Sequence, residues 1–223
     1  MKLLVSLMSA ALLTACGNNP PVPDWQANAK AATERSIVAY LVGNTRIDAA
    51  ELARARSEVA RSGRVDLLAR VELSHCAAQV ASLVFGPCAG FEPLRADAAP
   101  PERAYADYLM AKLTPAAPAD AALLPEAHRG IAPAAIADPL ARLIAAGVMF
   151  QAGRADPPLI ALAIATASEQ GWRRPLLAWL GVQLKRAEQA GAGDEAAALR
   201  RRIALVERGE RGESGAAPAT TSP

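Results

Sequence analysis

The chain has 223 residues, and its formal net charge at pH 7 is only +2. A balance so close to neutral lacks the basic excess typical of nucleic-acid-binding domains, so we expect no nucleic-acid partner. Hydrophobic residues make up 52% of the chain but aromatic residues only 4%. Because alanine and leucine supply much of this apolar content and are strong helix formers, the composition favours an all-α fold of closely packed helices.

The first sixteen residues have the order of a secretory signal. Lys2 precedes an apolar run over residues 3–13, and small residues lead to Cys16. The run has roughly 11 residues, whereas a helix that spans a bilayer needs about 20. The end of the segment, Leu-Thr-Ala-Cys, resembles the lipobox of bacterial lipoproteins, in which the signal (here residues 1–15) is removed and the cysteine is lipidated. The alternative is an ordinary cysteine within a cleaved signal.

The lipobox resemblance implies where in the cell the mature protein is located. It implies a lipid anchor on Cys16 with several acyl chains, since a single chain holds a protein on a membrane only reversibly. Gly17 follows the cysteine, whereas an aspartate there would, in that family, favour the inner membrane. The resemblance therefore implies the outer membrane, facing the periplasm. Residues 16–24 are expected to form the lipidated tether, with no helical period.

Helical periodicity predicts an N-terminal subdomain over residues 25–113. Four helices are expected there, over residues 25–42, 47–61, 64–85 and 100–113. Asp24 is the expected N-cap of the first helix, and apolar residues nearly all round the third predict that it is buried. Residues 47–113 also resemble an uncharacterised family of proteobacterial lipoproteins, a resemblance that implies no activity and no site residues.

Two cysteines remain once Cys16 takes the lipid. In the oxidising periplasm the pair Cys76 and Cys88 predicts a disulfide, and two buried free thiols are the alternative. A helix that continued to Phe85 would leave Cys76 about 13.5 Å back along the axis, whereas bridged Cα atoms lie about 5.5 Å apart. We therefore predict that the helix loosens by about Ser82, or that the two cysteines are not bridged.

Residues 114–137 are rich in alanine and proline, which predicts a connector and hinge between two halves. Beyond it, Asp138 and Asp156 each precede a proline, which is the signature of an N-cap followed by the first helical position. These signals predict a C-terminal helical subdomain over residues 138–208. The composition of residues 209–223 predicts a disordered tail.

Short helices joined by tight turns are expected to form antiparallel neighbours. Their lengths and spacing resemble tetratricopeptide-type helical hairpins, and Trp179-Leu180-Gly181 carries part of that signature without completing it. The expected fold is therefore all-α and built from antiparallel helical hairpins. The resemblance implies that these hairpins stack in an array.

Residue types that carry chemistry are sparse. His75 is interpreted as a packed or partly exposed residue, and His128, in the connector, as a solvated one. The sequence contains no Gly-x-Ser-x-Gly turn, phosphate loop or dinucleotide-binding motif. We therefore expect no enzyme activity, no cofactor and no metal site. A hydrolase would be indicated only by one of these histidines within hydrogen-bond reach of a serine and a carboxylate.

Two classes of partner follow from these expectations. An anchored stack of helices offers a broad groove, which favours a protein-interaction scaffold or accessory factor in the cell envelope. The alternative is a binder of an envelope lipid or peptidoglycan fragment, with Trp172 and Trp179 lining an apolar cavity and Arg173 and Arg174 at its edge. For these four residues, a core position for the tryptophans and a solvated face for the arginines are the competing interpretation.

Overall fold

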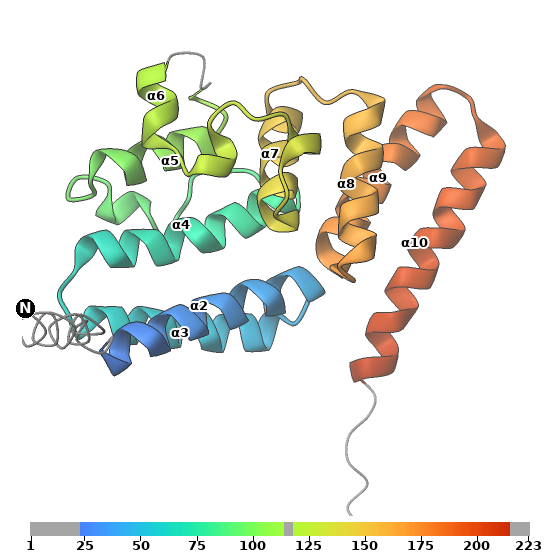
Figure 1. Cartoon of the computed structure of the whole chain (residues 1–223). Coiled ribbons are helices and arrows are strands. Elements are labelled where there is room, and N and C mark those ends of the chain that lie inside the picture. The colour runs from blue at the N-terminus through green and yellow to red at the C-terminus, as the bar shows by residue number, and fades with distance from the viewer. Residues whose placement is uncertain (1–22, 114–117, 215–223) are drawn as a thin grey trace, which may run out of the picture.

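A computed structural model describes residues 23–113 and 118–214, and within these two ranges helices are joined by turns and loops, without a strand (Figure 1). The all-α fold expected from the composition is confirmed. The helices are, in chain order, α2 (Asp24–Val42), α3 (Thr45–Ala60), α4 (Val65–Ala81), the short η1 (Glu92–Leu94), α5 (Pro100–Leu109), α6 (Pro118–Leu123), the short η2 (Glu126–His128) and η3 (Pro133–Ala135), α7 (Pro139–Gln151), α8 (Pro157–Glu169), α9 (Arg173–Gln189) and α10 (Gly193–Ser214).

Helix α4 is the centre of the first part of the molecule. Figure 1 shows it between the α2–α3 hairpin on one side and α5 with α6 on the other. Helix α7 packs against α4, and α7, α8, α9 and α10 then follow one another, each in contact with the next. The structure is thus an array of neighbouring helical hairpins, and α9 also returns to contact α2.

The capping signals of the second half are confirmed. The carboxylates of Asp138 and Asp156 each accept a hydrogen bond from the backbone N–H three residues on, at 2.7 and 2.9 Å. Asp24 does not cap α2, because it lies inside the first turn and Pro23 occupies the N-cap position. An acidic side chain there still interacts favourably with the positive end of the helix dipole.

One apolar cluster joins helices from both sides of the predicted connector, since it runs from α4 and α5 through to α10. Trp179 is fully buried in it, and its indole N–H donates a hydrogen bond to the carbonyl of Ala81 at 3.2 Å. Helices α4 and α7 approach closely at Gly147, where an added Cβ would lie 2.3 Å from the carbonyl oxygen of Val80. The two halves therefore share a core.

Residues 118–137 are more structured than the expected connector. They carry α6, η2 and η3, and Leu124 and Ile136 are buried. The short helices contact α5 and α7, and the burial of the two apolar side chains outweighs the local preference of an alanine- and proline-rich segment for an open loop. Residues 114–117 lie outside the described ranges.

Two predicted helix ends differ from the structure, whereas α4 ends at Ala81, close to the predicted loosening at Ser82. Helix α5 ends at Leu109 rather than at residue 113. Ala111 adopts a left-handed conformation with φ of 54°, which takes the chain out of α5, and Leu113 then packs against the core from outside the helix. Helix α10 continues to Ser214, six residues past the expected helix end at residue 208, and residues 215–223 lie outside the described ranges.

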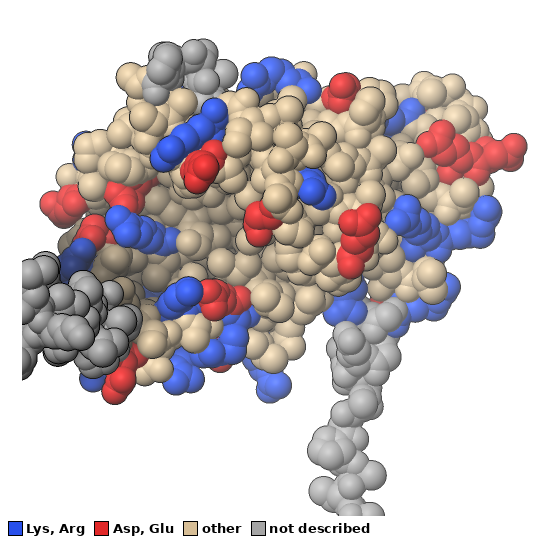
Figure 2. Space-filling model, viewed as in Figure 1, with Lys and Arg blue, Asp and Glu red and all other residues tan. Residues whose placement is uncertain are grey.

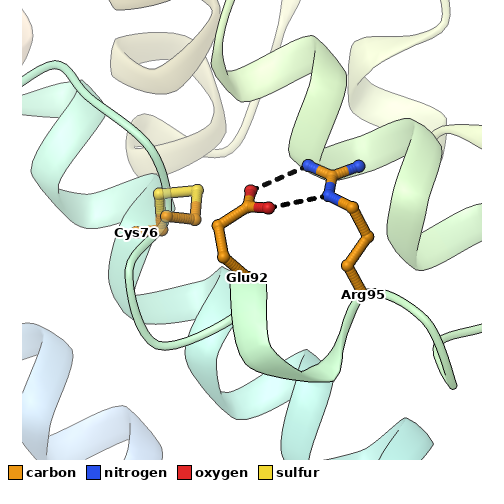
Figure 3. Close-up of a disulfide and its surroundings, with 4 residues drawn as sticks. Cys76, Glu92 and Arg95 are labelled. Atoms are coloured by element: carbon orange, nitrogen blue, oxygen red, sulfur yellow. Dashed lines mark hydrogen bonds and ion pairs between the residues drawn. A yellow bond between two sulfur atoms is a disulfide. The ribbon is translucent and has the colours of Figure 1, made fainter.

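The disulfide between Cys76 and Cys88 is present, with 5.5 Å between the Cα atoms (Figure 3). It forms because α4 stops at Ala81 and the chain turns back at Leu83, where φ is 58°. The helix therefore loosens where the spacing of the cysteines required it. The returning loop carries the Glu92–Arg95 ion pair drawn in Figure 3, and Arg95 also pairs with Asp107 of α5, so the loop is tied to α5 as well as to α4.

Candidate functional site

The exposed side of α4 forms the floor of a long depression. A cavity of about 490 Å³ lies between α4, α5 and α6, and a second of about 470 Å³ lies between α2 and α4. Arg70 and Ser74 of α4 line both cavities, which makes them one continuous surface that we call the trough. Figure 2 shows this face hollowed between the α2–α3 hairpin and α5, with charges of both signs around it.

The trough contains a buried carboxylate that is only half satisfied. The guanidinium of Arg70 donates to Oε1 of Glu102 at 2.8 Å. The Glu102 side chain is 6% exposed, whereas that of Arg70 is 64% exposed. Oε2 of Glu102 is buried and has no hydrogen-bond partner within the described ranges. A buried unpartnered oxygen is costly, so it is a strong acceptor for a donor that enters once the exposed arginine side chain moves.

Aromatic rings separate the trough from another cavity. Tyr105 lines the trough and stacks on Tyr108 and His128, with ring centroids 6.1 and 5.7 Å away. Tyr108 and His128 in turn line a cavity of about 340 Å³ beside α7, which we call the ring cavity. Burial raises the pKa of both tyrosine hydroxyls, so both remain protonated at neutral pH.

His128 corrects a sequence-based prediction. It was expected to be solvated, but it is only 4% exposed, and burial lowers its pKa to about 4. Its Nδ1 lies 3.4 Å from the hydroxyl of Tyr108. The signal in the sequence was the pair Tyr105 and Tyr108, which are three residues apart and so present two rings on one side of a helix for a third ring to join.

His75 does lie near a carboxylate and a serine, the arrangement that would indicate a hydrolase. Its Nε2 is 3.0 Å from Oδ1 of Asp48, and the hydroxyl of Ser36 donates to that same oxygen at 2.7 Å. The carboxylate therefore stands between the other two groups, whereas a nucleophilic serine must bond to the imidazole and face the substrate. Because Ser36 is 1% exposed, the trio acts as a link between α2, α3 and α4.

The four residues expected to surround a ligand cavity have structural contacts instead. Trp179 has no exposed surface, and Trp172 is half-buried beside α2. The guanidinium of Arg173 donates twice to the carbonyl of Val42, at 2.8 and 3.1 Å. That of Arg174 lies 4.1 Å from the centre of the Tyr40 ring and also donates to Thr45. The arginines and Trp172 therefore hold α9 against the end of the α2–α3 hairpin.

Cys16 lies outside the described residues, so its lipidation stays a prediction. Within residues 23–113 and 118–214, no helix has both the length and the apolar character needed to cross a bilayer. The same ranges contain no group of three potential metal-ligating side chains. Comparison with known protein families, curated proteins and solved structures finds no match.

Proposed function

We propose that this chain is an outer-membrane lipoprotein whose helical domain faces the periplasm and acts as a protein-interaction scaffold or accessory factor in the cell envelope. The trough is the observation that carries the scaffold proposal. It joins two cavities across α4, and it brings together apolar, aromatic and charged side chains from α2, α4, α5 and α6. The resemblance of residues 13–16 to a lipobox supports the anchor.

The trough is suited to a segment of a partner protein. Trp25, Leu67 and Leu123 supply apolar surface along it, and apolar burial is the main driving force of protein association. Oε2 of Glu102 is an acceptor suited to a backbone or side-chain N–H of the segment. Arg129 donates from Nε to the carbonyl of Leu124 at 2.9 Å. Its other N–H groups have no acceptor among the described residues, so a partner can supply one.

The alternative prediction, binding of an envelope lipid or peptidoglycan fragment, depended on a cavity lined by Trp172 and Trp179. Burial of Trp179 removes that support. We therefore place protein docking first, and lipid or glycan capture becomes an outcome of the experiment.

A substitution in the trough tests the scaffold proposal. Ser74→Arg puts a long side chain on the floor shared by both cavities, and Ser57→Arg makes the same change on an exposed surface of α3 as a matched control. After crosslinking in cells and purification of the lipoprotein, we expect Ser74→Arg to lose co-purifying envelope protein at least tenfold, and Ser57→Arg to retain it. Equal recovery with both folded variants, or recovery of only lipid or glycan, would contradict the proposal.

The anchor is tested separately. Cys16→Ser removes the group that would carry the acyl chains, so we expect the protein to move from the membrane fraction to the soluble periplasmic fraction. Retention of this variant in the membrane fraction would show that attachment does not depend on Cys16.

A further inference from the structure

The ring cavity lies apart from the trough and has a different composition. Its volume of about 340 Å³ is within the range of roughly 300–1,000 Å³ found for small-molecule pockets. Ala145, Val148 and Met149 of α7 provide an apolar wall. Ile131, which is 42% exposed, stands at the same cavity, so it has apolar surface that a ligand can cover.

Polar groups gather in the same cavity. The imidazole of His128 is bonded at Nδ1 to the hydroxyl of Tyr108, and its Nε2 has no hydrogen-bond partner among the described residues. When the tyrosine hydroxyl donates to Nδ1, the proton of the neutral ring is on Nε2. The side chain then holds an N–H donor with no acceptor among the described residues, and a ligand in the cavity can supply one.

Arg154 adds a positive charge to this cavity. Its side chain is exposed, and within the described ranges no carboxylate forms an ion pair with it. It lies close enough to Tyr108 for its charge to act on that hydroxyl. A guanidinium has five N–H donors and no acceptor. Arg154 therefore favours a ligand that brings a negatively charged acceptor. Such a ligand also favours the tautomer of His128 that has its proton on Nε2.

We propose that the ring cavity binds a small carboxylate with an apolar body, whose oxygens accept hydrogen bonds from Arg154 and from Nε2 of His128. The apolar body lies against Val148 and Met149 of α7. A compact doubly charged anion such as inorganic phosphate matches the arginine but leaves the apolar wall uncovered, so it binds less well. This site is independent of the trough. The experiment that tests it therefore leaves the scaffold proposal unaffected, whatever its result.

Benzoate is the probe that tests this site, because it combines a carboxylate with a rigid apolar ring. The full-length protein is labelled with ¹⁵N in its histidines and titrated while the ring nitrogens of His128 and His75 are followed by NMR. We expect a saturable shift at His128 and none at His75, which is bonded to Asp48. Benzyl alcohol tests the need for the charge and inorganic phosphate the need for the apolar body, and each is expected to bind at least about tenfold more weakly.

The matched variants are Arg154→Gln and Arg201→Gln, which remove exposed arginines beside the cavity and on α10. Arg154→Gln is expected to weaken benzoate binding about tenfold, because it removes a charge-assisted hydrogen bond. Arg201→Gln is expected to leave benzoate binding unchanged. Three results would overturn the proposal: no shift of the His128 signals at saturating benzoate, equal binding of phosphate, or equal effects of the two substitutions. The wild-type titration decides the matter even if a variant folds poorly.

Discussion

Helices α2 to α6 and helices α7 to α10 are stabilised in different ways. Among the residues whose burial the structure describes, most buried polar and charged side chains lie in the first region and its continuation to η2: Ser36, Asp48, Glu72, Ser82, Glu102 and His128. In α7 to α10, as far as residue 208, Thr166 is the one such residue. Both the trough and the ring cavity use residues of the first region. The trough thus belongs to the region that buries polar groups, whereas the ring cavity lies where that region meets α7. The second region contributes much of the apolar core.

The largest effect is expected from the apolar region. Trp179→Ala removes a fully buried indole from the core shared by α4, α7 and α9. We expect the free energy of unfolding to fall by about 4 kcal/mol, from lost burial and from the cavity left behind. Urea denaturation followed by circular dichroism measures the change. A loss below about 1 kcal/mol, as for an exposed side chain, would show that the two halves do not share this core.

A somewhat smaller effect is expected from an ion pair in the first region whose carboxylate is buried and whose arginine is half-exposed. Arg56 donates to both carboxylate oxygens of Glu72, which is 6% exposed. Arg56→Met leaves that carboxylate buried and unpaired, and we expect a loss of about 3 kcal/mol. The double variant Arg56→Met/Glu72→Met should recover most of it, since apolar replacement of both partners is often neutral. A double variant no better than the single one would mean that the pair itself supplies the stability.

The buried imidazole predicts a pH dependence. Burial lowers the pKa of His128 from 6.5 to about 4 in the folded protein, although the charge of Asp138 acts in the opposite direction. As the pH falls, the unfolded chain takes up the proton first. The free energy of unfolding should therefore fall by about 1.4 kcal/mol per pH unit between pH 6.5 and 4, relative to His128→Gln. Parallel stability curves for the two proteins over this range would contradict the burial of a neutral ring.

The smallest effect concerns the helix caps. Asp156→Ala removes the side-chain acceptor for the backbone N–H of Leu159 at the start of α8. The expected loss is about 1 kcal/mol. Asp24→Ala is the control, because Asp24 lies in the first turn of α2 and accepts no capping hydrogen bond, and it should cost less. A larger loss for Asp24→Ala would reverse the assignment of the two roles.

The second region could be predicted because its signals are local. An aspartate before a proline starts α7 and α8, and apolar residues at helical spacing show which side each helix buries. In the first region the decisive contacts join residues far apart in the sequence. Asp48 pairs with His75, 27 positions on, and Arg70 with Glu102, 32 positions on. Periodicity contains no information on such pairs, so the trough could not be predicted from the sequence. For the burial of His128 the sequence held one indirect signal, the spacing of Tyr105 and Tyr108.

The disulfide could be predicted only in part from the sequence. Counting cysteines favoured the pairing of Cys76 with Cys88, and helix geometry required that α4 end near Ser82 for the bond to form. The structure meets both conditions. The two candidate tryptophans could not be told apart by sequence, since Trp172 and Trp179 are seven residues apart and their burial depends on which helices pack over them.

The central claim is that the trough is a docking surface for an envelope protein, and photo-crosslinking from two exposed leucines tests it most directly. Leu123 lines the trough and is 37% exposed, and Leu205 on α10 is 63% exposed. A photoreactive residue at each position is activated in living cells, with and without Ser74→Arg. The account predicts one discrete protein adduct from position 123, lost with Ser74→Arg and absent from position 205. The same adduct from both positions, or no protein adduct from position 123, would contradict it.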